Sequence, residues 1–200
     1  MSPNLLGTRS LRIVLMVDIA NPINLGGWNF AMNEMIPVLR SIADENPYVA
    51  IHLQVVRCSP GPTWQNLGLV ADAAFQGLTA EPRSGMGQGL KSVASTLATE
   101  CMPRVCLPPV IVLVSDLPRS DDFAEGLAEF MNHPWGRLSV RLGLAVGGNA
   151  DLAALQEFIG HAEIQPFTPA SSGDLLNYIR WVEEDVADET DCDQPEPEVW

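Results

Sequence analysis

Two uninterrupted apolar runs, each followed by an aspartate, constrain the fold of this 200-residue chain more than any other feature. Leu11–Val17 leads into Asp18, and Val110–Val114 leads into Ser115 and Asp116. Such runs are typical of strands that are buried on both faces of a parallel sheet. Open α/β sheets bind ligands at the carboxyl ends of their strands, so we expect both carboxylates at one pole of the molecule.

A third stretch, Ser84-Gly85-Met86-Gly87, lies just before a segment with helical periodicity over Gly87–Thr99. That helix would feed the second of the two buried strands. Ser84 is therefore expected at the same pole as the two aspartates. The sequence predicts a pole built from two carboxylates and one hydroxyl.

Strand-like and helix-like segments alternate along the chain without an internal repeat. Strands are expected over 11–18, 48–58, 109–115, 138–146 and 163–167, and helices over 28–44, 87–99, 121–132, 150–158 and 171–184. This alternation predicts a three-layer α/β/α fold with a doubly wound, mostly parallel sheet. The link between the predicted strand over 48–58 and residues 63–75 is too short for a crossover connection, so we expect one antiparallel edge strand within 63–75. Pro37 is expected to kink or split the first helix.

Composition narrows the classes of partner. Hydrophobic residues make up 46% of the chain, charged residues 18%, and the formal net charge is −14. This charge argues against nucleic acid and anionic membranes as partners. We expect an N-terminal arm over 1–10, one folded domain over 11–185 and an acidic flexible tail over 186–200. No transmembrane or secretory segment is expected, and four cysteines without metal-type spacing indicate a cytoplasmic protein with free thiols.

The order of Asp18, Ser84 and Asp116 along the chain resembles that in the von Willebrand factor type A (vWA) domain, and within that family the bacterial TerY-like branch. The resemblance covers roughly Leu11–Val182. In this family the first strand ends in Asp-x-Ser-x-Ser, a threonine precedes a helix, and a later strand ends in an aspartate. Together they form a metal-ion-dependent adhesion site (MIDAS) that binds magnesium or manganese. The resemblance implies that Asp18, Ser84 and Asp116 are the metal ligands.

The match to the adhesion site is incomplete, because Ala20 and Pro22 replace its two serines and Arg83 stands where glycine is usual. Magnesium prefers six oxygen ligands in octahedral geometry. Two interpretations stay open. Either a degenerate site holds magnesium or manganese weakly, or the pole is free of metal and its carboxylates are compensated by Arg83 or by water. Taken singly, each aspartate could also simply cap the following helix.

The resemblance implies a non-enzymatic protein-interaction domain of a bacterial cytosolic stress, phosphosignalling or conflict (defence) system. Its implied partner is a kinase, a phosphatase or a MoxR-type ATPase. The residues agree with this expectation, since no nucleophile with a matching base and no cofactor loop is recognisable. The main alternative is metal-dependent ligand binding, and a third is an enzyme that uses magnesium on Asp18 and Asp116.

The partner is expected to bind through the loops at the carboxyl end of the sheet. The predicted contact residues are Asn21, Trp28, Arg83, Met86, Asp121 and Asp122. Each also has a structural interpretation: Asn21 can form a local turn before Pro22, Trp28 can pack in the core, and the two aspartates can begin a helix.

Overall fold

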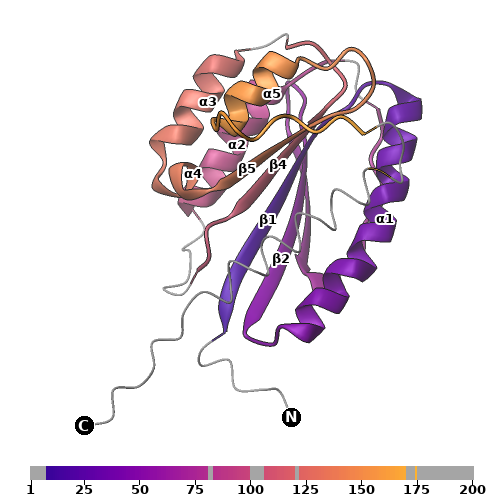
Figure 1. Ribbon diagram of the computed structural model, residues 1–200, viewed down its shortest axis with the longest axis vertical. Coiled ribbons are helices and arrows are strands. Elements are labelled where there is room, and N and C mark those ends of the chain that lie inside the picture. Colours follow the sequence, from indigo (N-terminus) through magenta and orange to yellow (C-terminus); the bar gives the residue numbers. More distant parts are fainter. Residues whose placement is uncertain (1–7, 81–82, 100–105, 120–121, 170–173, 175–200) are drawn as a thin grey trace.

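Five strands form one sheet at the centre of the molecule (Figure 1). The computed structural model describes residues 8–80, 83–99, 106–119, 122–169 and 174. Within these residues the strands are β1 (Arg9–Asp18), β2 (Val49–Arg57), β3 (Thr63–Leu69), β4 (Val110–Ser115) and β5 (Val140–Ala145). Their spatial order is β3-β2-β1-β4-β5; β3 pairs antiparallel with β2, and the other neighbours are parallel. The predicted α/β class, with one antiparallel edge strand, is confirmed.

Helices cover both faces of this sheet. They are α1 (Pro22–Glu45), α2 (Met86–Thr99), α3 (Phe123–Asn132), α4 (Pro134–Leu138) and α5 (Leu152–Ile159), and a short 3-10 turn η1 (Val70–Asp72) follows β3. One hydrophobic core lies between α1 and the sheet, and a second lies between the sheet and α2, α3 and α5. Figure 1 shows α1 on the opposite side of the sheet from the other helices. The fold therefore has the three layers that the alternating pattern predicts.

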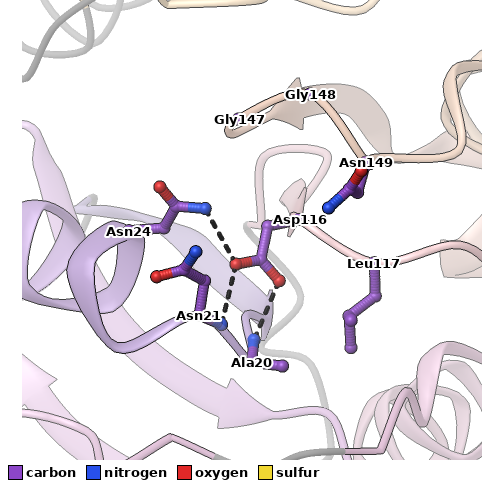
Figure 2. Close-up of a pocket in the computed structure, with 8 residues that line it drawn as sticks. All are labelled: Ala20, Asn21, Asn24, Asp116, Leu117, Gly147, Gly148 and Asn149. Carbon is purple, nitrogen blue, oxygen red and sulfur yellow. Dashed lines mark hydrogen bonds between the residues drawn. The ribbon is translucent and has the colours of Figure 1, made fainter.

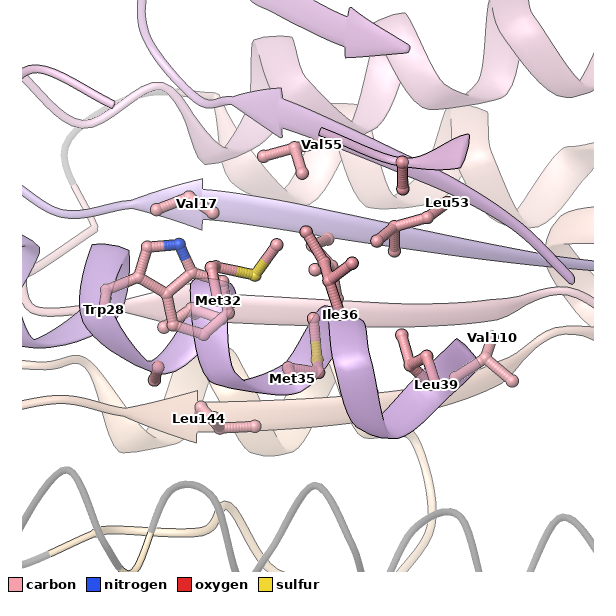
Figure 3. Packing of buried hydrophobic residues seen from close by; sticks show 14 of the residues in the cluster. Val17, Trp28, Met32, Met35, Ile36, Leu39, Leu53, Val55, Val110 and Leu144 are labelled. Atoms are coloured by element: carbon pink, nitrogen blue, oxygen red, sulfur yellow. The ribbon is translucent and has the colours of Figure 1, made fainter. Parts of the chain in front are cut away.

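The first core is built on the apolar face of α1. Its buried side chains are Leu25, Trp28, Ala31, Met32, Met35, Ile36 and Leu39, which pack on the strand residues shown in Figure 3. Trp28 is only 1% exposed. The prediction that Trp28 contacts a partner is therefore wrong, because its indole ring is enclosed between the helix and the sheet.

Helix α1 begins six residues earlier than the predicted start at Trp28. Asn21 is its N-cap: the side-chain oxygen of Asn21 accepts a hydrogen bond of 2.9 Å from the backbone N–H of Ile23. Pro22 occupies the first helical turn, where its fixed φ favours helix and its missing N–H costs nothing. Pro37 was expected to kink or split the helix; it lies inside α1, which continues to Glu45, so the helix is not split there.

Two elements near β5 differ from the prediction. The expected strand over 163–167 is a single bridge, in which Phe167 donates to Gly143 O and accepts from Ala145 N. Pro166 precedes that bridge, and proline has no N–H to continue a ladder. Helix α4 was not predicted; the His133 side chain caps it by accepting from Trp135 N at 3.3 Å.

The chain ends are described only in part. The expected arm over 1–10 is shortened, because β1 begins at Arg9. The predicted helix over 171–184 lies outside the described residues apart from Asp174, and the predicted tail over 186–200 lies outside them entirely. Among the described residues, no helix is both long and apolar enough to cross a membrane.

Candidate functional site

Asp18 lies at the carboxyl end of β1 and is 1% exposed. One of its carboxylate oxygens, Oδ2, accepts from the Ser84 hydroxyl at 2.9 Å and from the Ser115 hydroxyl at 3.2 Å. The other oxygen, Oδ1, accepts from the backbone N–H of Gly85 at 3.1 Å. Three donors from two distant segments therefore hold this buried carboxylate, as the burial of a charged group requires.

Ser84 and Gly85 come from the loop that precedes α2, and this loop is pressed against the end of β2. A Cβ atom on Gly85 would lie 2.3 Å from the backbone of Ser59, so a side chain is excluded there. Met86 follows as the first residue of α2 and is fully buried in the second core. The prediction that Met86 contacts a partner is therefore wrong. The close approach at Gly85 is what brings the hydroxyl of Ser84 to Asp18.

Asp116 follows β4 and is also buried, with 4% of its surface exposed. Its Oδ1 accepts from Ala20 N at 2.8 Å, and its Oδ2 accepts from Asn21 N at 2.9 Å and from the Asn24 side-chain amide at 3.0 Å. The backbone N–H of Asp116 donates to Asp18 O at 3.2 Å. The hydrogen bonds to the carboxylate of Asp116 thus stabilise the loop between β1 and α1.

The structure brings the three predicted ligands to the same pole, but it divides them into two clusters. Ser84 bonds to Asp18, and both are enclosed beneath the surface. Asp116 bonds instead to the segment Ala20–Asn24. These clusters are joined through the backbone bond between the two aspartates.

A pocket of about 390 Å³ opens beside Asp116. Its lining residues are Ala20, Asn21, Asn24, Asp116, Leu117, Gly147, Gly148 and Asn149 (Figure 2). The glycines and Asn149 belong to the segment after β5, and Figure 2 shows them on the other side of Asp116 from Ala20. The pocket therefore lies at the carboxyl ends of β1, β4 and β5, where parallel sheets commonly bind ligands.

The donor set at this pole does not fit a metal site of the adhesion type. Ala20 and Pro22 supply no side-chain oxygen, and the oxygens of Asp18 and Asp116 accept six hydrogen bonds from protein donors. Asn24 turns its amide nitrogen toward Asp116, and nitrogen donors of this kind repel a cation. No cluster of three or more acidic, histidine or cysteine side chains suited to a metal occurs in the described part of the chain. Water can complete the six oxygen ligands of magnesium, but direct protein ligands are still required, and both carboxylates here already accept protein donors.

The other predicted contact residues have different positions. Asn21 is exposed and lines the pocket, while Arg83 is exposed in the loop before α2. Asp122 is exposed at the start of α3, where a hydrogen bond with Glu125 raises the pKa of Asp122 and lowers the pKa of Glu125. Asp121 lies outside the described residues.

Sequence reasoning missed the second wall of the pocket. Gly147, Gly148 and Asn149 follow the apolar strand β5, so the rule that identified Asp18 and Asp116 would also have indicated them. Gly147 has φ of +75°, and a Cβ on it would lie 2.9 Å from the Asn24 side-chain nitrogen. Glycine is therefore needed where this loop approaches α1.

Similarity to known proteins is found at the level of structure and not at the level of sequence. No protein-family profile matches the sequence, and no curated protein is significantly similar to it. Solved structures do match. The pilus adhesin SpaC from Lactobacillus rhamnosus GG aligns with a TM-score of 0.65 and 14% identity, over 91% of this chain and 30% of SpaC.

Two further structures give similar values. A von Willebrand factor type A protein from Catenulispora acidiphila aligns with a TM-score of 0.61 and 12% identity, over 88% of this chain and 42% of that protein. Proximal thread matrix protein 1 from the mussel byssus, with a zinc-occupied MIDAS motif, aligns with a TM-score of 0.63 and 15% identity, over 88% of this chain and 47% of that protein. The chain thus spans less than half the length of these structures. At such identities the likeness shows the fold alone, which is the vWA fold.

Proposed function

We propose that this chain is a non-enzymatic protein-interaction domain that binds its partner at the carboxyl ends of β1, β4 and β5. The observation that carries the proposal is the pocket beside Asp116, which opens at this pole and is lined by three asparagines. Ile23, in the first turn of α1 between two of them, is 83% exposed. An open pocket with a mixed polar and apolar lining, next to an exposed aliphatic residue in the sequence, provides a surface for a protein partner.

The chemistry of the pole supports a role without catalysis. Ser84 and Ser115 are buried, with 5% and 0% of their surface exposed, so neither hydroxyl is open to a substrate. A nucleophilic serine needs an open path to the substrate in addition to a base that accepts its proton. Asp116 is engaged by backbone and amide donors, which suits a structural carboxylate.

The names of the matched proteins agree with an interaction role. SpaC is a pilus adhesin, and the mussel protein is a matrix protein of the byssus. From the TerY-like resemblance of the sequence we extend the proposal to a bacterial cytosolic stress, phosphosignalling or conflict system with a kinase, phosphatase or MoxR-type ATPase as partner. A gene for such a partner beside the gene for this chain would support the extension, and neighbours of unrelated function would count against it.

Site-specific photo-crosslinking tests the proposal directly. A photoreactive amino acid is placed at Ile23, beside the pocket, or at Tyr48, which is 75% exposed just before β2 and hence at the amino ends of the strands. Irradiation of cells that produce each variant should give a crosslinked protein from position 23 and none from position 48. Crosslinks from position 48 alone would refute the proposed surface.

Metal-dependent ligand binding is the second candidate, favoured by the zinc-occupied motif of the mussel protein. The hydrogen bonds that already occupy Asp18 and Asp116 oppose it in this chain. Thermal melting in the presence of divalent ions separates the two candidates, because an ion that binds the folded state raises the melting temperature.

A further inference from the structure

The carboxylate of Asp116 keeps one hydrogen-bonding position unused. A carboxylate has about four lone-pair sites, two on each oxygen. Oδ2 of Asp116 accepts from Asn21 N and from the Asn24 amide, whereas Oδ1 accepts from Ala20 N alone. Since Asp116 lines the pocket, its remaining Oδ1 site is the one left for a ligand.

The charge of Asp116 is also without a counter-charge in the described part of the chain. Its three donors are neutral amides, and no lysine, arginine or histidine of the described residues forms an ion pair with it. Arg119, three residues further along, is engaged with Asp151 and Glu157. A nearly buried carboxylate without a cation favours the approach of a positive group.

The remainder of the pocket lining is uncharged and combines polar and apolar residues. Among the described residues that line the pocket, Asp116 alone is charged, and Asn149 with two glycines forms the facing wall (Figure 2). The volume of about 390 Å³ is far above the roughly 30 Å³ occupied by one water molecule, so a side chain has room to enter. A single free position on a carboxylate suits an ammonium group, which donates one hydrogen bond to it, while the other positions of Asp116 are occupied by protein donors.

We propose that the partner inserts a lysine side chain into this pocket, with its ammonium group on Oδ1 of Asp116. This inference rests on the proposed function and adds the chemistry of the partner to it. Lysine is preferred to arginine because the arginine fork pairs with both oxygens of a carboxylate, and Oδ2 is already saturated by two donors. Leu117, which lines the pocket, offers an apolar surface for the four-carbon stem of lysine. The formal net charge of −14 favours a basic partner during approach.

Titration of the full ¹⁵N-labelled chain with three capped tripeptides tests this proposal. The peptides are acetyl-Gly-Lys-Gly-amide, acetyl-Gly-Arg-Gly-amide and acetyl-Gly-Glu-Gly-amide, and the readout is the amide signals of Gly147, Gly148 and Asn149. We expect saturable shifts at millimolar concentration with the lysine peptide, at least threefold weaker binding of the arginine peptide, and no shifts with the glutamate peptide. Equal or tighter binding of arginine would overturn the proposal, as would binding of the glutamate peptide when magnesium is added.

Two variants that add the same charge, one in the pocket lining and one away from it, test whether binding is specific to the pocket. Asn149→Lys puts an ammonium group beside Asp116, whereas Asn33→Lys puts the same charge at an exposed position further along α1. The first variant should weaken binding of the lysine peptide at least tenfold, and the second should change it less than twofold. Equal effects of the two variants would contradict a specific pocket, because they would indicate a general charge effect.

The crosslinking experiment separates this inference from the proposed function. If position 23 still crosslinks its partner at full yield in the Asn149→Lys background, the lysine pocket is refuted while the interaction surface stands. If position 23 gives no crosslink in any background, the proposed surface fails, whatever the peptides show.

Discussion

Ser84 gives the sharpest test of how this pole is held together. Its hydroxyl donates at 2.9 Å to the carboxylate of Asp18, which is only 1% exposed. Ser84→Ala removes this donor, while the hydroxyl of Ser115 and the amide of Gly85 still donate to the carboxylate. Water has little access to replace the lost bond, since Ser84 itself is 5% exposed.

The expected loss follows from the charge of the acceptor. A hydrogen bond to a charged group contributes roughly 1.5–3 kcal/mol to stability, about twice that of a neutral pair. We therefore expect Ser84→Ala to lower the free energy of unfolding by about 2 kcal/mol. For a chain of this length that corresponds to a decrease in melting temperature of about 4–8 °C.

Urea unfolding followed by tryptophan fluorescence measures this change, because Trp28 is buried in the folded state and becomes exposed on unfolding. The matched control is Ser41→Ala, since the exposed hydroxyl of Ser41 makes only a long bond of 3.4 Å to Glu45. The control should change the free energy of unfolding by less than about 0.5 kcal/mol.

A double-mutant cycle then assigns the effect to the pair. In an Asp18→Asn background the acceptor is neutral, so Ser84→Ala should cost about 1 kcal/mol or less. If Ser84→Ala were as harmless as Ser41→Ala in the wild-type chain, the idea that a buried charged hydrogen bond replaces metal coordination at this pole would be wrong.

Three further predictions concern the pocket and the core. Addition of 5 mM magnesium or manganese should leave the melting temperature unchanged, because the oxygens of Asp18 and Asp116 accept protein hydrogen bonds; a rise that disappears in Asp116→Ala would restore the metal site. Gly147→Ala should lower the free energy of unfolding by about 1–3 kcal/mol because of its φ of +75° and the nearby Asn24, as urea unfolding would show, and an unchanged midpoint would contradict this geometry. Trp28→Ala should cost about 3–5 kcal/mol by the same assay, and a loss below about 1 kcal/mol would mean that the indole ring is not in the core.

Local patterns in the sequence were enough to predict the three layers of the fold. The apolar runs of β1 and β4, and the short link between β2 and β3, predict a mostly parallel sheet with an antiparallel edge. The same runs place Asp18 and Asp116 at strand ends, because neighbouring parallel strands end on the same side of a sheet. Helix starts were predicted less well: Asn21 and Pro22 form a start signal that lies before the apolar periodicity of α1.

The partners of each polar side chain could not be predicted in this way. Nothing local to Asp116 indicates that it bonds to Ala20 and Asn24, which are more than ninety positions away in the chain. Sequence periodicity put Trp28 on the apolar face of its helix, yet only the packing of α1 on the sheet decides that its whole ring is enclosed. The predicted compensation of the pole by Arg83 also differs from the observed bonds of Asp116, which come from neutral groups.

The sequence by itself determined which residues could stand at the pole, since the positions of strands and of their ends follow from hydrophobic patterning over short windows. Only the tertiary structure decided that Asp18 is enclosed with two hydroxyls while Asp116 borders an open pocket. The physical reason is that burial and hydrogen bonding depend on which distant segments come together. The loop before α2 closes over Asp18, whereas the glycines after β5 leave space beside Asp116.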